Sequence, residues 1–477
     1  MIFTSLEFAG FVALVVILNW LLPKPYRPAL LLVGSYLFYA TWSVPAISVL
    51  FAITVITYFS ALAIPKLEGG ARTALTTFAV LCAAGTLVAF KAIEALGFQN
   101  SDNLPGIGAK LVVPVGLSFF AFQAISYVVD VNKRTVEPTR SPIDVALYLA
   151  FFPHLLAGPI VRAAKLIPAF HAVSRWPEAN RTQEGLELIL VGVFKKVALA
   201  DPVFAQIGTA LTDPQAAGRA NALMAQVMLL VAAYLDITAY VDIARGVAKL
   251  LGIDMQRNAL YPLTKTRGYG DFWRRWQLTI MMWFRDYIFR PLRGTGRQEW
   301  REDAALFGTF FALGIWHGFT AGWFLWGIAS GLIIVTERRL QSRRAKKRRA
   351  QTVAARQARK RSMLPKDPPA WRSHVIGLLL VLATFPLVSA PSLSGAFDQY
   401  KALFTADPEP FHWNLLLMGL VAIAGVIVLD RREERREARA GKSDPMVLPR
   451  ALAFGAMVAA IIVFSGPTPK TFLYFAF

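Results

Sequence analysis

His317 is the residue best suited to chemistry in this chain of 477 amino acids. It interrupts a long apolar stretch, LFGTFFALGIWHGFTAGWFLWGIASGLIIV, whose flanks near Arg301 and Arg338 are basic. An ionisable side chain deep within a membrane is a functional candidate by default, because burying it in hydrocarbon costs free energy. A neutral imidazole can take a proton from a hydroxyl group, as acyl transfer from a thioester requires. The alternatives are a histidine bonded to a neighbouring helix and one at the outer turn of a hairpin, and composition does not separate the three.

Two carboxylates, Asp236 and Asp242, lie in another apolar stretch, YLDITAYVDIARGVAKLLGI. Asp236 and Tyr240 are four residues apart and share a helix face, while Asp242 precedes Arg245 by three residues and can pair with it. Polar side chains inside membranes often hold helices together, and we favour this structural interpretation. The alternative is that Asp236 and Tyr240 position a substrate in a polar tunnel.

A region rich in arginine and aromatic residues runs from about 253 to 303. Four aromatic residues and one isoleucine are spaced three and four apart, which predicts one apolar helix face. They are Trp273, Trp276, Ile280, Trp283 and Tyr287. Such a helix can lie in the membrane interface with its indole edges at head-group level. Arg274 and Arg285 lie off this face, and guanidinium groups bind phosphate in a bidentate manner. Interfacial anchoring and binding of a phosphate-bearing donor are therefore equal alternatives.

Other reaction classes fit the sequence poorly. It contains no phosphate-cradling P-loop, no zinc-protease HExxH and no GxSxG nucleophile elbow. Five histidines and a single cysteine argue against a metal centre. That cysteine, Cys82, lies in an apolar run, where a small buried side chain is the usual role. We expect no metal and no resident cofactor.

Composition predicts an all-α, polytopic integral membrane protein. The chain is 55% hydrophobic and 17% charged, whereas a soluble protein carries about a quarter charged residues. Many apolar runs approach the ~20 residues that a spanning helix needs, and a β-barrel would show alternating segments of about ten residues instead. We expect about 11–13 transmembrane or re-entrant helices in a single membrane-embedded domain over residues 1–477.

Basic residues between the apolar runs predict the orientation of the chain. Lys24 and Arg27 follow the first apolar run, so Met1 is expected outside. The stretches 337–372 and 430–449 are expected to be charged cytoplasmic loops. Such loops explain the net charge of +21 and can touch anionic lipid head groups. A tail that binds nucleic acid is the weaker explanation.

Several segments together resemble the alginate O-acetyltransferase branch of the membrane-bound O-acyltransferase family. They are VPVGLSFFAFQAISYVVDV, FFPHLLAGPIVRAAKLIPAF, GVFKKVALAD, YLDITAYVDIARGVAKLLGI, GDFWRRWQLTIMMWFRDYIFRPLRG and GIWHGFTAGWFLWG. The opening MIFTS and the closing FLYFAF are similar as well. The resemblance runs nearly end to end in the family order, so the series is specific although no single segment is. It implies a helical membrane fold around a central tunnel.

The resemblance also implies roles for individual residues. His317 stands in the WHG motif, whose histidine is the catalytic base of the family, and its neighbour Trp316 is expected to position substrate. Arg274 and Arg275 of the FWRRW motif are expected to do the same. The family usually has a second histidine where this chain has Gln277. An amide can hydrogen-bond a donor carbonyl but cannot titrate, so we expect Gln277 to position the donor.

The reaction implied by the resemblance is acetyl transfer onto an exopolysaccharide such as alginate. The expected donor is a cytoplasmic thioester, acetyl-CoA or a related one, and a periplasmic acetyltransferase partner would place the group on sugar hydroxyls. The expected location is the bacterial inner membrane. Coenzyme A is too polar to cross, whereas an acetyl group is small, so a tunnel makes physical sense. The alternatives are a related enzyme, such as one for D-alanyl transfer to teichoic acid, and a transporter, which the WHG and FWRRW segments disfavour.

Overall fold

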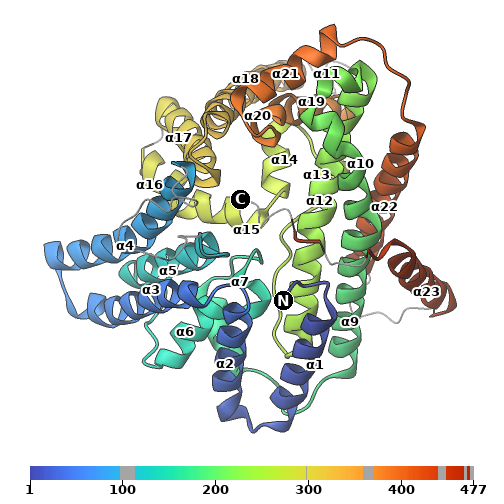
Figure 1. Ribbon diagram of the computed structural model, residues 1–477. Coiled ribbons are helices and arrows are strands. Elements are labelled where there is room, and N and C mark those ends of the chain that lie inside the picture. Colours follow the sequence, from blue (N-terminus) through green and yellow to red (C-terminus); the bar gives the residue numbers. More distant parts are fainter. Residues whose placement is uncertain (97–112, 297, 358–368, 439–446, 467–469, 473–477) are drawn as a thin grey trace.

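The computed structural model describes residues 1–96, 113–296, 298–357, 369–438, 447–466 and 470–472, and their regular secondary structure is helical (Figure 1). The first part of the chain forms α1 (Leu6–Leu21), α2 (Arg27–Ala40), α3 (Val44–Ala63), α4 (Gly69–Ala95), α5 (Leu117–Asn132), α6 (Pro142–Ala150), α7 (Phe152–Leu155), α8 (Ala163–His171), α9 (Ala179–Phe194), the π-helix η4 (Lys195–Ala200), α10 (Asp201–Thr212), α11 (Pro214–Ala217) and α12 (Arg219–Leu250). The second part forms α13 (Pro262–Lys265), α14 (Tyr269–Arg275), α15 (Leu278–Phe284), the π-helix η5 (Arg285–Phe289), α16 (Arg290–Arg293), α17 (Glu299–His317), α18 (Ala321–Gln357), α19 (Ala370–Thr384), α20 (Pro386–Ser389), α21 (Leu393–Thr405), α22 (Trp413–Ala438) and α23 (Val447–Phe464). The predicted all-α fold class is confirmed.

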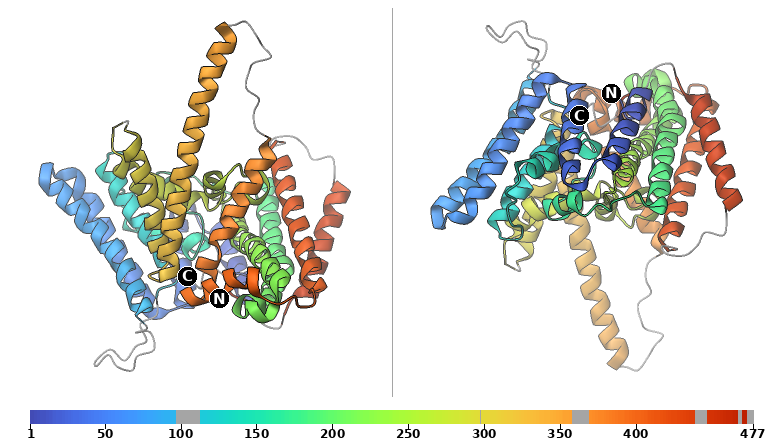
Figure 2. Two further views of the ribbon diagram at one scale, coloured as in Figure 1. Left: turned by 90° about the horizontal axis from the view of Figure 1, so that it is seen from above. Right: turned by 90° about the horizontal axis from the view of Figure 1, so that it is seen from below.

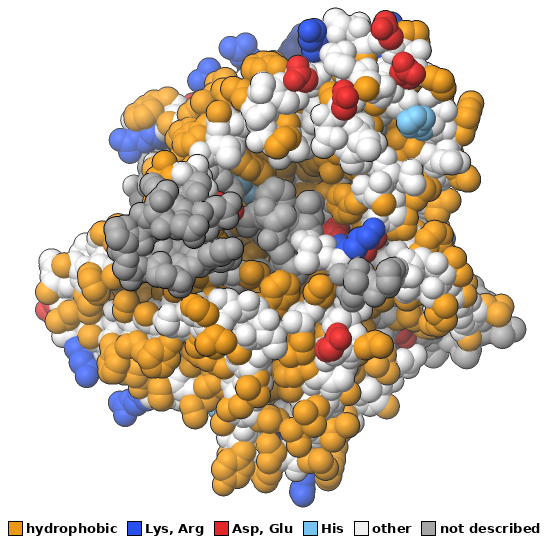
Figure 3. Space-filling view, in the orientation of Figure 1, with side chains coloured by type: hydrophobic (Ala, Val, Ile, Leu, Met, Phe, Trp, Pro, Cys, Tyr) orange, Lys and Arg blue, Asp and Glu red, His pale blue; other side chains and the backbone are white. Residues whose placement is uncertain are grey.

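Five helical segments of the described residues are long and apolar enough to cross a membrane. They are Val44–Lys66, Gly69–Ala95, Arg219–Leu250, Ala370–Ser389 and Trp413–Arg436. The apolar stretch of the third, α12, is 72% buried, whereas those of the other four are only 22–39% buried. Apolar side chains accordingly cover much of the molecular surface in Figure 3. The chain is therefore a multi-pass membrane protein with α12 in its core and the other four helices toward lipid, while the predicted number of spans and the tunnel stay predictions.

The core helix α12 packs closely against α9. A Cβ atom added at Gly246 of α12 would lie 2.5 Å from the carbonyl oxygen of Gly185 on α9, so the backbones touch only because no side chain intervenes. Small residues at helix crossings have this effect in membranes, where dispersion contacts and hydrogen bonds replace the hydrophobic effect between helices. A second close approach, 2.7 Å from a Cβ added at Gly192 of α9 to the carbonyl oxygen of Ala239, brings the end of α9, and with it η4, against α12.

Helices α17 and α18 form an antiparallel hairpin whose turn carries His317. The hairpin is tight, because a Cβ at Gly314 would lie 2.5 Å from the carbonyl oxygen of Trp323. Beyond the hairpin α18 continues to Gln357 and projects from the body of the molecule (Figure 2). The N-terminus lies at the opposite end of the molecule from this projection, and the orientation of the chain in the membrane stays a prediction (Figure 2).

The predicted loop over 337–372 is wrong in its first part, because residues 337–357 continue α18 as helix. The segment is rich in alanine, arginine, lysine and glutamine, which have high helix propensity. Its first turn is also anchored to α17, where Arg338 and Arg339 both bind the carboxylate of Asp303, the latter at 2.7 Å. The predicted loop over 430–449 likewise begins late, since α22 runs to Ala438. Residues 358–368 and 439–446 of the two predicted loops lie outside the described residues.

Candidate active site

His317 is the last residue of α17 and lies in a cage of indole rings. Its imidazole stacks on Trp323 with ring centres 4.2 Å apart, and Trp316 and Trp326 contact it at 4.3 and 6.1 Å. The helix ends here because Gly318 turns to an extended conformation before α18 starts at Ala321. His317 thus occupies the turn of a hairpin and is partly buried. Planar walls on several sides restrict the rotation of the imidazole, as a positioned base requires.

Lys91 of α4 joins this cage from a distant part of the chain. Its ammonium group donates a hydrogen bond to the backbone carbonyl oxygen of His317 at 2.9 Å, and Lys91 is only 7% exposed. Sequence reasoning missed this residue. The available signal was a lone lysine in the apolar run AFKAIEAL, since a cation in a spanning helix is rarely without a function. The bond fixes the carbonyl group at the end of α17 and places a positive charge beside the histidine.

Trp316 provides a buried indole N–H that finds no acceptor among the described residues. The residue is buried between Phe122 and Phe284, and within the described part of the chain its indole Nε1 has no acceptor. By contrast, Trp283 in the same aromatic wall donates its indole N–H to the carbonyl oxygen of Phe122 at 2.9 Å. A buried donor without a partner costs free energy. Trp316 is therefore suited to a substrate carbonyl, as the sequence predicted for its position.

Gln277 lies at a break between α14 and α15. Its backbone is left-handed, with φ 49° and ψ 53°, which is uncommon for a residue other than glycine. The predicted continuous helix face from Trp273 to Tyr287 is therefore wrong, because this residue interrupts the helix. Backbone strain of this kind costs about 1–3 kcal/mol and persists only where the surroundings enforce it.

Asn258 enforces the conformation of Gln277. The Asn258 amide donates to the Gln277 Oε1 at 3.3 Å, and the Asn258 backbone carbonyl accepts from the N–H of Leu278 at 2.8 Å. Its side-chain Oδ1 accepts from both the backbone N–H and the hydroxyl of Thr279, at 2.9 and 2.8 Å. A cavity of about 10 Å³ adjoins Gln277 and Asn258. This volume can hold about one water molecule. A donor group must displace side chains to reach Gln277 from this cavity.

Arg274 and Arg275 lie on a separate, strongly basic cavity of about 380 Å³. It is lined by Lys265, Arg267, Asp271, Arg274 and Arg275. Arg275 binds Asp271 at 2.9 Å, while Arg274 is 70% exposed and lies 3.6 Å from the same carboxylate. Burial raises the pKa of Asp271, but the hydrogen bond and charge of Arg275 outweigh it and hold that pKa below its ordinary value. Lys265 is paired with Glu434 at 2.8 Å, but three arginines against one carboxylate still leave a surplus of positive charge suited to phosphate.

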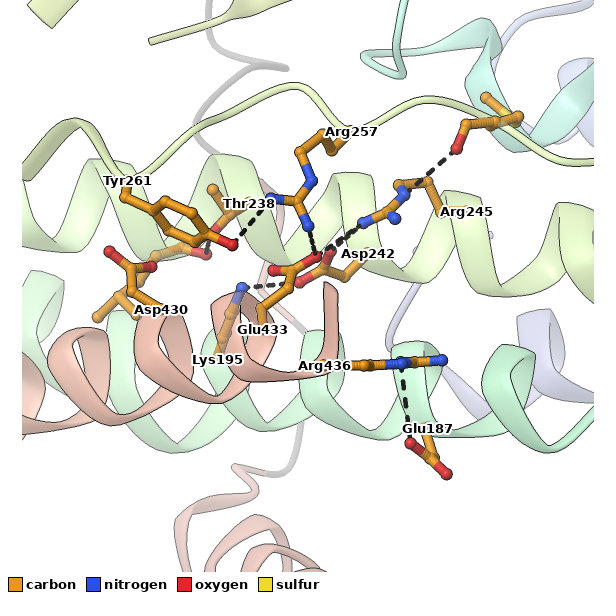
Figure 4. Close-up of polar contacts among 12 residues, drawn as sticks. Glu187, Lys195, Thr238, Asp242, Arg245, Arg257, Tyr261, Asp430, Glu433 and Arg436 are labelled. Atoms are coloured by element: carbon orange, nitrogen blue, oxygen red, sulfur yellow. Dashed lines mark hydrogen bonds and ion pairs between the residues drawn. The ribbon is translucent and has the colours of Figure 1, made fainter. Parts of the chain in front are cut away.

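Asp236 and Asp242 belong to a buried charge network on α9, η4, α12 and α22. Lys195 binds Asp242 at 2.7 Å, and the predicted pairing of Asp242 with Arg245 is confirmed at 3.3 Å. Glu433 of α22 joins the network through Arg245 at 3.5 Å and also binds Arg257 at 2.7 Å (Figure 4). The sequence missed the lysine because it lies 47 residues before its partner. The network holds three segments of the chain together, in agreement with the favoured structural interpretation.

The adjacent Lys196 binds Asp236 at 2.7 Å and Asp201 at 2.9 Å. Both consecutive lysines reach α12 because η4 is a π-helix, whose wider turn often marks a functional segment. Tyr240, one turn beyond Asp236, donates its hydroxyl to the Pro153 carbonyl at 3.3 Å. Asp236 is therefore part of a buried ion-pair cluster, whereas the hydroxyl of Tyr240 bonds to the backbone of α7. A substrate-positioning role for them stays a prediction.

Comparison with known proteins agrees with this architecture. The model of the membrane-bound O-acyltransferase family (MBOAT) matches residues 35–358. A probable alginate O-acetylase of Azotobacter vinelandii is 30% identical over 421 residues, which cover 85% of this chain and 78% of the relative. A peptidoglycan O-acetyltransferase of Helicobacter pylori is 30% identical over 66% of this chain and 65% of its own. A teichoic acid D-alanyltransferase of Bacillus subtilis is 23% identical over 47% of this chain and 59% of its own. With a family model that spans more than half of its length, this chain is an acyltransferase and belongs to the membrane-bound O-acyltransferase family.

Proposed function

We propose that this protein passes acetyl groups from a cytoplasmic thioester, through the inner membrane, to an acceptor hydroxyl for O-acetylation of an exopolysaccharide. The observation that carries the proposal is the WHG turn, where His317 is held by stacked indole rings beside the unused N–H of Trp316. Two of the similar proteins are named as O-acetylating enzymes, of alginate and of peptidoglycan, which supports a polysaccharide acceptor.

In the proposed reaction His317 acts as a general base. It takes the proton of the attacking hydroxyl while the hydroxyl oxygen bonds to the thioester carbonyl carbon. Collapse of the tetrahedral intermediate breaks the carbon–sulfur bond, and the leaving thiolate receives the proton from the imidazolium. The N–H of Trp316 stabilises the negative charge on the carbonyl oxygen, an effect worth about 2.7–4 kcal/mol for one donor of an oxyanion hole.

The basic cavity supports a donor that carries phosphate groups, as acetyl-CoA and phosphopantetheine do. Its arginines, Arg274 and Arg275, stand only two or three positions before Gln277 in the chain. A donor with its phosphates on these guanidinium groups would extend its pantetheine arm along the break between α14 and α15. Gln277 would then hydrogen-bond an amide or carbonyl of that arm, which needs no titrating group.

A D-alanyl transferase is the alternative within the same family. The D-alanyltransferase of Bacillus subtilis matches less than half of this chain, so the similarity supports it less than an O-acetyltransferase. A periplasmic partner that places the acetyl group on the sugar is part of the proposal for exopolysaccharide, since the chain itself has no soluble domain in its described residues.

Mass analysis of the cell-surface polymers, with and without the gene for this chain, tests the proposal. We expect O-acetyl esters on an exopolysaccharide to disappear when the chain is absent and to return with the wild-type gene. Loss of D-alanyl esters with unchanged O-acetyl content would assign the alternative. Unchanged acyl content in every polymer would overturn both.

A further inference from the structure

A cavity of about 500 Å³ lies between α12, α19 and α22, away from His317 and its indole cage. This volume falls within the range of ~300–1,000 Å³ that is typical of ligand pockets. Most of its lining is aliphatic, from Val231 of α12, Leu378 of α19, and Ile423 and Val426 of α22. None of the residues assigned to the proposed acyl transfer needs this apolar space.

The cavity borders the side of the molecule that faces lipid. The apolar stretches of α19 and α22 are only 22% and 33% buried, so both helices present most of their surface outward. Leu378 and Ile423 are partly exposed, whereas Val231 on α12 is buried at the back of the cavity. An acyl chain can therefore enter sideways between α19 and α22 and contact α12, without leaving hydrocarbon.

One end of the cavity is polar. Among the described residues, some of its charged side chains have ion-pair partners and others do not. Asp430 faces inward, where its carboxylate accepts hydrogen bonds from the hydroxyls of Tyr234 and Thr264 at 2.7 and 2.9 Å. Lys265 binds Glu434 at 2.8 Å. Arg431 is exposed and has no ion-pair partner in the part of the chain that the structure describes.

The same end adjoins the basic cavity, because Lys265 lines both. Arg431 and the surplus cations of the basic cavity together favour an anion, whereas the aliphatic lining favours a hydrocarbon chain. An aliphatic slot whose polar end carries Arg431, unpaired within the described ranges, next to the basic cavity, matches one class of membrane molecule.

We propose that the cavity is a binding site for an anionic phospholipid. One acyl chain lies between α19 and α22 against α12, and the phosphate of the head group lies at Arg431 and Lys265. Basic residues at the end of a membrane helix attract anionic head groups in this way. The site shares Lys265 with the basic cavity, but the inference does not depend on the proposed acyl transfer.

Native mass spectrometry of the full-length protein, purified in detergent and stripped of lipid, tests the proposal. The probes are dioleoyl phosphatidylglycerol and the zwitterionic dioleoyl phosphatidylcholine. We expect one saturable phosphatidylglycerol molecule per chain and at least tenfold weaker binding of phosphatidylcholine. Leu378→Trp, which fills the cavity, is expected to abolish that binding. Leu379→Trp is the matched control, because Leu379 is 58% exposed and does not line the cavity.

Arg431→Gln tests the head-group contact without altering the aliphatic slot. We expect about fivefold weaker binding of phosphatidylglycerol, since one basic residue at a membrane surface contributes about 1 kcal/mol. Arg435→Gln, one turn further along α22, should bind as the wild type does. Equal binding of both lipids, or undiminished binding by both Leu378→Trp and Arg431→Gln, overturns the proposal. Equal thermal stabilisation by inorganic phosphate alone would assign the polar end to a free anion and overturn it as well.

Discussion

The ammonium group of Lys91 lies 2.9 Å from the backbone carbonyl oxygen of His317, although 226 residues separate them in sequence. The bond joins α4 to the end of α17 and fixes the turn on which the imidazole is carried. A hydrogen bond from a charged group is worth about 1.5–3 kcal/mol, so its loss is expected to disturb the orientation of the histidine more than the fold as a whole.

Lys91→Met is therefore expected to lower kcat by about 10- to 100-fold, because His317 loses the hydrogen bond that orients it. KM for the donor should change little, because Lys91 does not line the basic cavity. Lys91→Arg keeps a cation and should restore part of kcat. Thr86→Val, elsewhere on α4 where the hydroxyl bonds to the carbonyl oxygen of Cys82, serves as the control with near wild-type activity. Equal kcat for wild type and Lys91→Met in detergent would remove Lys91 from the site.

His317→Ala is expected to reduce acetyl transfer by about 10² to 10⁴-fold, the usual contribution of a positioned general base. His317→Gln should fail to a similar degree, because it keeps a hydrogen-bonding side chain but loses basicity. The measurement is the acetate content of the polymer, normalised to the amount of protein inserted in the membrane. Wild-type acetylation by a well-expressed His317→Ala variant would refute the proposed mechanism.

Gln277→Ala is expected to raise KM for the donor, whereas Gln277→His should be tolerated. The reason is that the Gln277 amide, oriented by Asn258 at 3.3 Å, acts by hydrogen bonding and not by proton transfer. Gln226→Ala is a matched control, since this buried glutamine donates to Gln399 at 2.6 Å away from the basic cavity. The control should lose stability without a change in KM. An unchanged donor KM in Gln277→Ala would show that the positioning role is wrong.

Lys195→Met is expected to destabilise the protein by about 3–5 kcal/mol, because it leaves the buried carboxylate of Asp242 without its 2.7 Å partner. The double variant Lys195→Met/Asp242→Leu should recover much of this loss, since it removes both charges. Thermal unfolding in detergent measures both. Lys346→Met, which breaks an exposed pair with Glu299, should leave the melting temperature unchanged. A melting temperature of Lys195→Met equal to that of the wild type would contradict a structural role for the network.

The orientation of the chain can be tested with single cysteines in a Cys82→Ala background. Ala350 lies on the projecting part of α18 and Glu409 lies between α21 and α22, and both are exposed. We expect an impermeant thiol reagent to label Glu409→Cys in intact cells, and Ala350→Cys only after the cells are opened. Labelling of Ala350→Cys in intact cells would reverse the predicted topology.

Local sequence patterns predicted the helical class and the pairing of Asp242 with Arg245, whereas a hairpin turn at His317 was only one of three alternatives. The first follows from apolar length and the second from helical spacing over three residues. Both depend on residues that are near one another in the chain. They required no knowledge of how distant segments pack.

The remaining features depend on such packing. The roles of Lys91 and Asn258 depend on hydrogen bonds to residues elsewhere in the chain, and no sequence periodicity predicts these bonds. The left-handed backbone of Gln277 interrupts a pattern of aromatic spacing that continues unchanged on both sides, so the pattern alone predicted an unbroken helix. The basic segment after Glu337 was misassigned because an exposed helix and a cytoplasmic loop share the same composition.

The contact between Lys196 and the carbonyl oxygen of Thr471, at 2.7 Å, has a consequence for the order of assembly. The two residues are 275 positions apart, so at ~5–20 residues per second the acceptor is synthesised roughly 14–55 s after the lysine. During that interval Lys196 can bind Asp201 and Asp236, but Phe472 cannot yet cover Tyr240. The contacts around Lys196 are therefore completed late in synthesis, after the five long apolar helices of the described residues have been made.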